Sequence, residues 1–282
     1  MTDLSDRQDV KLNPRGFQRG HVPEQPDEEL AGLVFVLDAQ AQQPAVVRLR
    51  EWSTTKLAPA AGEFAVDVGS GTGSEVLALA ALVGTSGRAV GIEPHPGLRA
   101  EAARRANNAG STAEFVDASA TDLPFADATV DLLRCERVFQ HLEDPQGAAT
   151  EFARVLAPGG RVAILDSDWA TAISTPGDPD VVRRMNEVMW ARTPNPFAGR
   201  HLRTQLVRAG LVPDPDVGSS ALVMPPDMTP FLIRTTLDES LEAGAITQAE
   251  ADAQWAALTE AVEKGESFLS VTMFAVVATK PS

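Results

Sequence analysis

The residues with the clearest chemical potential form one short stretch, in which Asp67 is followed by three glycines at every second position, Gly69, Gly71 and Gly73. Glycine lets a backbone turn sharply and exposes amide groups that a Cβ would shield from a ligand. An apolar run precedes the stretch and an Ala- and Leu-rich segment over 75–83 follows it, which predicts a strand, a tight turn and a helix. The helix N-terminus would add unpaired N–H groups and a partial positive charge. We therefore expect a ligand-binding loop at this position.

The spacing of the glycines indicates which ligand the loop would hold. A dinucleotide-binding turn has the pattern G-x-G-x-x-G, whereas this chain has G-x-G-x-G followed by Ser74 and Glu75. An acid in the first turn of the helix would repel a diphosphate, so the pattern disfavours a nicotinamide dinucleotide. A tight strand–helix turn without any ligand is the alternative, and a lone glycine pattern leaves it open.

Two more acids stand where the next predicted strands end. Glu93 closes an apolar run over 88–93, 20 residues after Gly73, and its carboxylate could accept both ribose hydroxyls of an adenosine. Asp117 closes a third run over 113–117 and is followed by Ala118. Polar residues at the carboxyl ends of three strands fit a ligand that lies along the switch point of an open α/β sheet.

Three segments further along carry a family resemblance. A fourth strand is predicted over 130–135, a helix begins at Asp144-Pro145, and a fifth strand is predicted over 161–166. Over residues 61–166 the chain resembles the Methyltransf_11 or UbiE-like branch of the class I S-adenosylmethionine (SAM) methyltransferases. The segments that carry the likeness, beside the glycine loop, are Asp117-Ala118-x-x-x-x-Leu123-Pro124-Phe125, His141-Leu142-x-Asp144 and Arg154-Val155-Leu156-x-Pro158-Gly159-Gly160-Arg161.

The resemblance implies an α/β fold with a Rossmann-like, seven-stranded sheet, in which the first five strands are parallel and the last is antiparallel, with helices on both faces. It also implies that SAM is the cofactor. The glycine loop would enclose its methionine part, Glu93 its ribose, and Asp117 with Ala118 its adenine. The residues that the resemblance assigns to the cofactor are Asp67, Gly69, Ser70, Gly71, Gly73, Glu93, Pro94, Asp117, Ala118 and Cys135.

The rest of the chain predicts a single methyltransferase domain over 26–282. Residues 1–25 are polar and aperiodic, which is typical of a disordered leader. Two helices over 26–58 would either cover the cofactor cleft or simply pack on the sheet edge. Later segments predict helices over 180–192, 199–209 and 229–243, a sixth strand over 211–224, a helix from the capping box Thr247-x-x-Glu250 to Lys264, and a last strand over 268–278. The insertion at about 227–265 is longer than the connection of a β-hairpin requires, and it predicts a helical cap over the active site.

The composition of the chain argues against several classes of binding partner and of site. The chain has 24 basic and 39 acidic residues, a formal charge of −15, and no basic block, so we expect no nucleic-acid or membrane partner. Its single cysteine excludes an intramolecular disulfide and a thiolate metal cluster, and no tyrosine is present to serve as a phenolate base. No apolar run approaches the length of a membrane span, and the first 20 residues lack an apolar signal segment, which favours a cytoplasmic protein. The sequence is also compatible with a homodimer.

Methyl transfer from a sulfonium is an in-line displacement, so positioning of the two partners is the protein's main contribution. A general base is needed only if the acceptor must lose a proton. The segment 136–141, which leaves the fourth strand, supplies His141 and Glu136 as catalytic candidates; a loop brace or a capping role is the alternative for each. No metal site is expected. The candidate substrate contacts are Arg137, Asp166, Asp168, Trp169, His201 and Phe231.

The sequence thus predicts a SAM-dependent methyltransferase that acts on a small-molecule acceptor, of the kind made in secondary metabolism. It leaves open whether oxygen, nitrogen or carbon is methylated. The alternative is a protein of the same fold that retains SAM or its demethylated product without transferring methyl, as a cyclase, a decarboxylase or a binding subunit.

Overall fold

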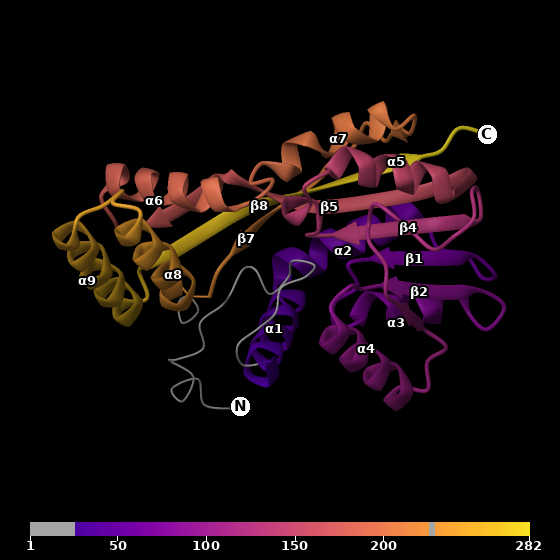
Figure 1. Cartoon of the computed structure of the whole chain (residues 1–282), viewed down its shortest axis with the longest axis horizontal. Helices are drawn as coiled ribbons and strands as arrows, with labels where there is room; N and C mark the ends of the chain where they lie inside the picture. The colour runs from indigo at the N-terminus through magenta and orange to yellow at the C-terminus, as the bar shows by residue number, and fades with distance from the viewer. Residues whose placement is uncertain (1–25, 226–228) are drawn as a thin grey trace.

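The computed structural model describes residues 26–225 and 229–282, apart from the side chains of Pro26, Phe231 and Leu232. The leader predicted over 1–25 lies outside the described residues. The chain folds around an eight-stranded sheet of order β3-β2-β1-β4-β5-β8-β6, in which β7 also pairs with β8 (Figure 1). This is the mixed α/β sheet that the sequence predicts.

The parallel part of the sheet positions the glycine loop. Each of its inner strands is a short apolar run, as expected for strands that helices cover on both faces. Neighbouring strands are parallel, and Val68 of the first strand lies between Ile92 and Cys135. The parallel strands are β1 (Phe64–Val68), β2 (Arg88–Ile92), β3 (Glu114–Val116), β4 (Val130–Glu136) and β5 (Leu156–Thr175).

The antiparallel edge has one strand more than predicted. β8 (Phe268–Thr279) pairs with β5, and its other edge pairs with β6 (Val212–Pro213) and then β7 (Gly218–Val223). The sequence predicts one strand over 211–224. Pro213 and Pro215 lack the N–H that a ladder needs, so the strand breaks between them and the next paired residue, and the sheet has eight strands instead of seven.

The fifth strand is much longer than the predicted 161–166. It runs beside β8 to Thr175, with an irregular register between Asp168 and Ile173. β5, β7 and β8 therefore form an arm that leaves the core, and the cap helices lie at its far end (Figure 1). These helices share a separate apolar cluster that includes Met185, Leu237 and Leu258. They are α6 (Pro179–Arg192), α8 (Thr229–Glu242) and α9 (Gln248–Lys264).

Helices cover the core sheet on both faces, and alternate residues of each strand separate into two apolar clusters. Val66 and Ile164 join one cluster with Phe152, while Ala65 and Leu165 join the other. The remaining helices are α1 (Pro26–Ala41), α2 (Pro44–Leu57), α3 (Ser74–Val83), α4 (Pro96–Asn108), the 3₁₀ turn η3 (Phe139–His141), α5 (Pro145–Val155) and α7 (Ala198–Arg208).

Two predicted helix starts are confirmed by their caps. The Thr247 side chain accepts a bond from the Glu250 amide, and the Glu250 carboxylate accepts one from the Thr247 amide. Asp144 accepts a bond from the Gly147 amide at the start of α5. Among the described residues no single helix is long and apolar enough to cross a membrane; α1 and α2 together meet that length and composition, but they are bent by 70°.

Candidate functional site

The glycine loop after β1 has a backbone that only glycine adopts easily. Gly69, Gly71 and Gly73 have φ angles of 75°, 53° and 84°, in the left-handed region. A Cβ on Gly69 would lie 2.2 Å from Val138 Cγ2, which belongs to the segment after β4. A Cβ on Gly73 would lie 2.8 Å from the Phe115 ring. The loop is therefore pressed between its neighbouring strands, and its amides lie at the carboxyl end of the sheet.

Glu93 joins this loop to the end of β2. Its carboxylate is buried and accepts bonds from the Gly71 amide at 2.8 Å and the His95 amide at 2.9 Å. Burial raises the pKa of Glu93, and the two amide donors oppose that rise. Each carboxylate oxygen retains a second lone pair with which it could accept a ligand hydroxyl.

The Ser70 hydroxyl of this loop lies against Gly91, because a Cβ on Gly91 would come within 2.6 Å of it. It is buried and has no hydrogen-bond partner among the described residues. A buried polar group without a partner is rare in a native protein and needs an explanation. The glycine backbone beside Ser70, whose amides no Cβ shields, and the remaining lone pairs of Glu93 leave polar groups for a ligand to bind. The residues present therefore fit the cofactor that the resemblance implies.

The ends of β2 and β3 are tied together by Arg99 of α4, which the sequence did not single out. Its guanidinium donates to the Glu93 carbonyl at 2.7 Å, to the Pro94 carbonyl at 3.3 Å and to the Asp117 carboxylate at 3.2 Å. Asp117 is exposed and Ala118 is buried. The two residues predicted to hold the adenine thus lie beside Glu93 at the same edge of the sheet.

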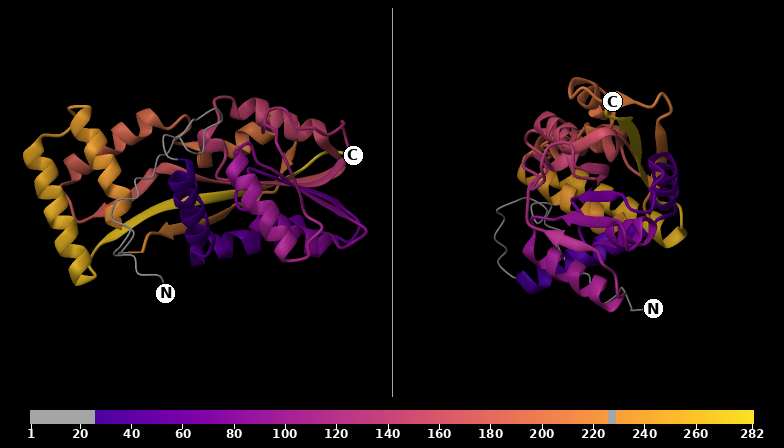
Figure 2. Two further views of the ribbon diagram at one scale, coloured as in Figure 1. Left: turned by 60° about the horizontal axis from the view of Figure 1, so that its bottom comes forward. Right: turned by 90° about the vertical axis from the view of Figure 1, so that its right-hand side faces the viewer.

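Helix α1 lies against this edge and contacts the glycine loop. A Cβ on Gly71 would meet Leu37 Cδ1 at 3.1 Å, and the Thr72 hydroxyl lies 3.3 Å from Asp38. Asp38 also accepts two bonds from Arg105 of α4, at 2.7 and 2.8 Å. Along the long axis of the molecule α1 lies between α4 and the cap helices (Figures 1 and 2). Helix α1 thus lies beside the glycine loop, whereas α2 packs on the sheet, with Val46 and Leu49 in the apolar cluster of Ala65.

A buried network of charges occupies the end of β4. Glu136, a predicted catalytic residue, is only 5% exposed and binds three arginines. Arg50 of α2 bonds both of its oxygens, at 2.7 and 2.9 Å, and Arg134 bonds it at 2.6 Å. Arg137 lies 3.1 Å from it. Burial would raise the pKa of Glu136, but the three guanidinium groups together hold it well below its usual range.

The same network takes in two acids near the glycine loop. Arg134 lies 3.4 Å from Asp67 and 3.3 Å from Glu75, and Arg50 bonds Glu75 at 2.9 Å. Burial raises the pKa of Asp67 to about 7, against the pull of Arg134. The carboxylate of Glu75 therefore has two guanidinium partners, which weakens the repulsion of a diphosphate inferred from its position alone.

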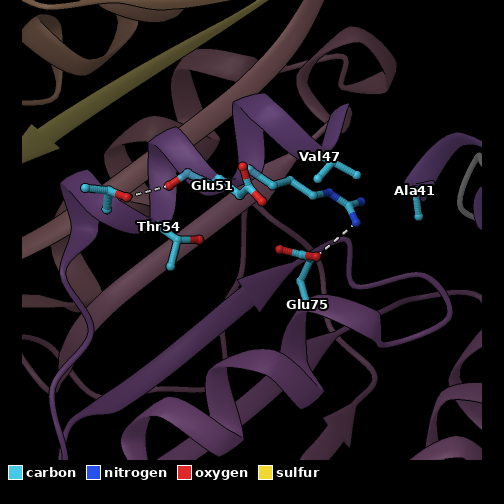
Figure 3. A pocket seen from close by; sticks show the side chains of 7 residues that line it. Ala41, Val47, Glu51, Thr54 and Glu75 are labelled. Carbon is cyan, nitrogen blue, oxygen red and sulfur yellow. Dashed lines mark hydrogen bonds and ion pairs between the residues drawn. The ribbon is translucent and has the colours of Figure 1, made fainter. Parts of the chain in front are cut away.

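An open pocket of about 440 Å³ reaches this network from outside, between the end of α1, α2 and α3. Figure 3 shows Glu75 on one side of the pocket, with Glu51 and Thr54 along α2. Its wall includes Arg50, so the charge network is accessible from this side of the molecule.

The turn η3 after β4 is held by Asp166. This carboxylate is fully buried and accepts bonds from the Gln140 amide at 3.1 Å and the Ser167 amide at 2.8 Å. Burial raises its pKa to about 7. His141 of the same turn is half-buried, and burial together with the positive charge of Arg137 lowers its pKa to about 4. The near-neutral pKa that would make His141 attractive as a base is therefore absent here.

Asp168 and Trp169, predicted to follow the fifth strand, lie within it and have structural partners. Asp168 forms a two-bond ion pair with Arg200 at the start of α7. The Trp169 indole donates to the Gln140 side chain at 2.8 Å. His201, on the same turn as Arg200, is exposed. The Phe231 side chain lies outside the described residues.

The resemblance assigns Cys135 to the cofactor, but its thiol belongs to the core. The side chain is fully buried in the apolar cluster beneath the sheet, between β1 and β5, and burial raises its pKa well above the usual value. Only its backbone can face a ligand at the strand end. The sequence also missed Arg50, Arg134 and Gln40. Arg134 did leave a signal, because a charged residue inside an apolar strand needs buried partners.

Comparisons with known proteins find methyltransferases among the relatives of this chain. The family model described as Methyltransferase domain matches residues 66–164. An uncharacterized 37.1 kDa protein in a transposon of Streptomyces fradiae is 31% identical over 259 residues, which cover 90% of this chain and 71% of that protein. The O-methyltransferase rstn1 of Aspergillus nomiae is 30% identical over 166 residues, which cover 59% of this chain and 72% of the relative.

A solved structure supports the fold. A putative sarcosine dimethylglycine methyltransferase from Galdieria sulphuraria superposes with a TM-score of 0.55 at 18% identity and covers 84% of this chain and 87% of the other. At that identity the likeness concerns the fold alone. The family model and the relatives show that this protein belongs to the class I SAM methyltransferases.

Proposed function

We propose that this protein is a SAM-dependent methyltransferase that acts on a small-molecule acceptor. The observation that supports it most is the cradle at the ends of β1 and β2. There the glycine loop, with φ angles of 53° to 84°, lies against Glu93, and the buried Ser70 hydroxyl has no partner among the described residues. A cradle of this kind suits a ligand with an amino-acid part and a ribose.

Each part of the cradle would have one task. The bound cofactor supplies a methyl group on a positively charged sulfur. The glycine loop gives room for close approach to its amides, and Glu93 accepts the ribose hydroxyls. Asp117 accepts a bond from the adenine amine, and the Ala118 amide donates to a ring nitrogen. The chain's contribution to the chemistry is to hold donor and acceptor in line.

The acceptor is a small molecule in this proposal because the chain is strongly acidic. A formal charge of −15 opposes nucleic acid and anionic membranes as partners. A cytoplasmic enzyme of secondary metabolism that uses no divalent metal is the setting we propose, and a homodimer is compatible with it. Turnover that persists after exhaustive chelation would support the absence of a metal, and rescue of lost activity by magnesium would contradict it.

Transfer of isotope tests the function. The protein is incubated with SAM labelled in its methyl group and a small-metabolite extract, and calorimetry measures SAM binding to the same preparation. We expect SAM to bind and the label to move into a small molecule. Binding without transfer would favour the alternative, a protein of the same fold that retains SAM or its product. If SAM does not bind, both functions are excluded.

A further inference from the structure

The three arginines at the end of β4 are not equally neutralised. Arg50 is bonded to two carboxylates, Glu136 and Glu75. Arg134 lies within ion-pair distance of three, which are Asp67, Glu75 and Glu136. Within the described part of the chain, Arg137 has one carboxylate at that distance, a Glu136 oxygen at 3.1 Å, and shares that acid with the other two arginines. The charge that is least matched in this network is therefore that of Arg137.

The second partner of Arg137 is neutral. Its guanidinium bonds the side-chain oxygen of Gln40, which comes from the last turn of α1. Asp166 acts on Arg137 only through space, because its carboxylate is hydrogen-bonded to backbone amides that include those of Gln140 and Ser167. An amide oxygen carries no net charge, so an anionic oxygen of a ligand would be a stronger partner than Gln40.

Arg137 is fixed in place by its backbone and is partly exposed. Its φ angle is 55°, in a region that non-glycine residues rarely adopt, and its amide donates to the Leu165 carbonyl at 2.7 Å. The side chain is 13% exposed, close to the 15% of Arg50 and more than Glu136 or Arg134. Strained backbone at the carboxyl end of a central strand is typical of residues that contact a ligand.

The groups that could take a proton from an acceptor are poorly suited to it. Glu136 is locked by three guanidinium groups, and the pKa of His141 is lowered to about 4. Asp166 is fully buried behind two backbone donors. A site with a charged guanidinium, in which each candidate base is ion-paired, buried or of low pKa, suits an acceptor that arrives already deprotonated, because such an acceptor needs no base.

We propose that Arg137 binds the carboxylate of an organic acid and presents one of its oxygens for methylation. This inference rests on the proposed function and names its substrate class. In the transfer an oxygen lone pair of the carboxylate forms the new bond to the methyl carbon while the sulfur–methyl bond breaks. The sulfonium becomes a neutral thioether, the carboxylate becomes a methyl ester, and no proton moves. Replacement of Gln40 by the carboxylate frees the amide side chain at the end of α1.

Binding of a simple acid is the first test. Benzoate and benzamide, which have nearly the same shape but differ in charge, are titrated by calorimetry into the protein saturated with S-adenosylhomocysteine. We expect millimolar or tighter binding of benzoate, at least about tenfold stronger than that of benzamide. Arg137→Gln should abolish the difference and Arg137→Lys should retain part of it, because lysine keeps the charge but not the two-pronged geometry. Equal binding of the two probes, or no binding of benzoate, would overturn the proposal.

Gln40 supplies a second, independent pair of variants. Gln40→Glu gives Arg137 a carboxylate of its own and should weaken benzoate binding at least about tenfold, whereas Gln40→Ala removes the internal competitor and should leave it equal or stronger. Loss of benzoate binding in both variants would contradict the proposal. Circular dichroism and binding of S-adenosylhomocysteine check that each variant is folded with its cofactor site intact.

The chemical class of the labelled product gives the second test and separates this inference from the proposed function. Methyl esters release label on mild alkaline treatment, whereas methylated amines keep it and bind a cation exchanger. Label in an alkali-labile product supports the carboxylate. Label in an amine, a carbon-methylated product or an alkali-stable ether overturns the inference and leaves the methyltransferase function standing.

Discussion

The carboxyl ends of the parallel strands and the loops after them form a rim. The two halves of this rim are held together in different ways. The loops after β1, β2 and β3 are held by backbone: left-handed glycines, amides that donate to Glu93, and carbonyls that accept from Arg99. The end of β4 is held by side-chain charges from distant parts of the chain, as in the pair of Arg50 and Glu136, 86 residues apart. Across the described residues, three acids and three arginines make up that network.

The difference shows where function can change without loss of the cofactor. A cradle made of backbone accepts one ligand shape, and its position can be predicted from the local sequence. A network of charges can take on a new acceptor when a single side chain is replaced, but each replacement risks leaving a buried charge without its partner. Substitutions in each half of the rim should separate these two behaviours.

The largest effect is expected when the charge network is broken. Glu136→Gln leaves the buried Arg134 and the partly buried Arg50 and Arg137 short of their shared acid and should lower the free energy of unfolding by about 3–5 kcal/mol, measured by urea denaturation. Glu114→Gln is the matched control, since its pair with Arg88 is half-exposed on both sides and should change stability by no more than about 1 kcal/mol. Equal losses in the two variants would contradict the buried network.

The second effect concerns the backbone cradle. Gly69→Ala introduces a left-handed alanine and a Cβ 2.2 Å from Val138, and should lower the free energy of unfolding by about 2–4 kcal/mol and weaken SAM binding. Gly265 is also left-handed, with a φ of 68° and a ψ of 23°, and has no atom within 4 Å of the position that a Cβ would take, so Gly265→Ala should show the backbone cost alone, about 1–2 kcal/mol. Calorimetry should find SAM binding altered only in the first variant.

A third variant tests the ligand contact within the cradle. Glu93→Ala removes an acceptor for two hydroxyls and should weaken SAM binding at least about tenfold, equivalent to about 1.4 kcal/mol. Glu114→Ala, which changes an exposed acid on the neighbouring strand, should leave SAM binding as it is. Unchanged SAM affinity in folded Glu93→Ala would show that the ribose assignment is wrong.

The smallest effect is expected at His141. If it were the general base, His141→Gln would lower turnover about 10²–10⁴-fold; with its pKa lowered to about 4, we expect a loss of less than about tenfold and no inflection of the wild-type rate near pH 6.5. The folded state binds the His141 proton less tightly than the unfolded chain does. Stability should therefore fall as pH drops from about 6.5 toward 4, and the variant should lose that part of the decline.

Local patterns carried most of what the sequence predicted. The glycine loop, the acids at the ends of β2 and β3 and the capping box at Thr247 each depend on a few neighbouring residues, and their places in the fold follow from strand order. The pairing of Arg50 with Glu136 could not be predicted, because nothing local links α2 to β4. The lowered pKa of His141 could not be predicted for the same reason, since it depends on burial that only the tertiary structure creates.

The arm has a mechanical consequence. β5 and β8 pass side by side from the core, where Arg161 faces Thr279, to the cap, where Thr175 faces Phe268. A ribbon of paired strands resists bending in its own plane and twists or flexes most easily where its hydrogen-bond ladder is broken, which in this arm is between Asp168 and Ile173. The cap helices are therefore joined to the core by a ribbon in which the β5–β8 ladder is irregular just beyond Asp168, while β7 stays paired with β8 beside it. A substitution that changed this irregularity would alter the direction in which the arm carries the cap helices while the strand ends keep their places.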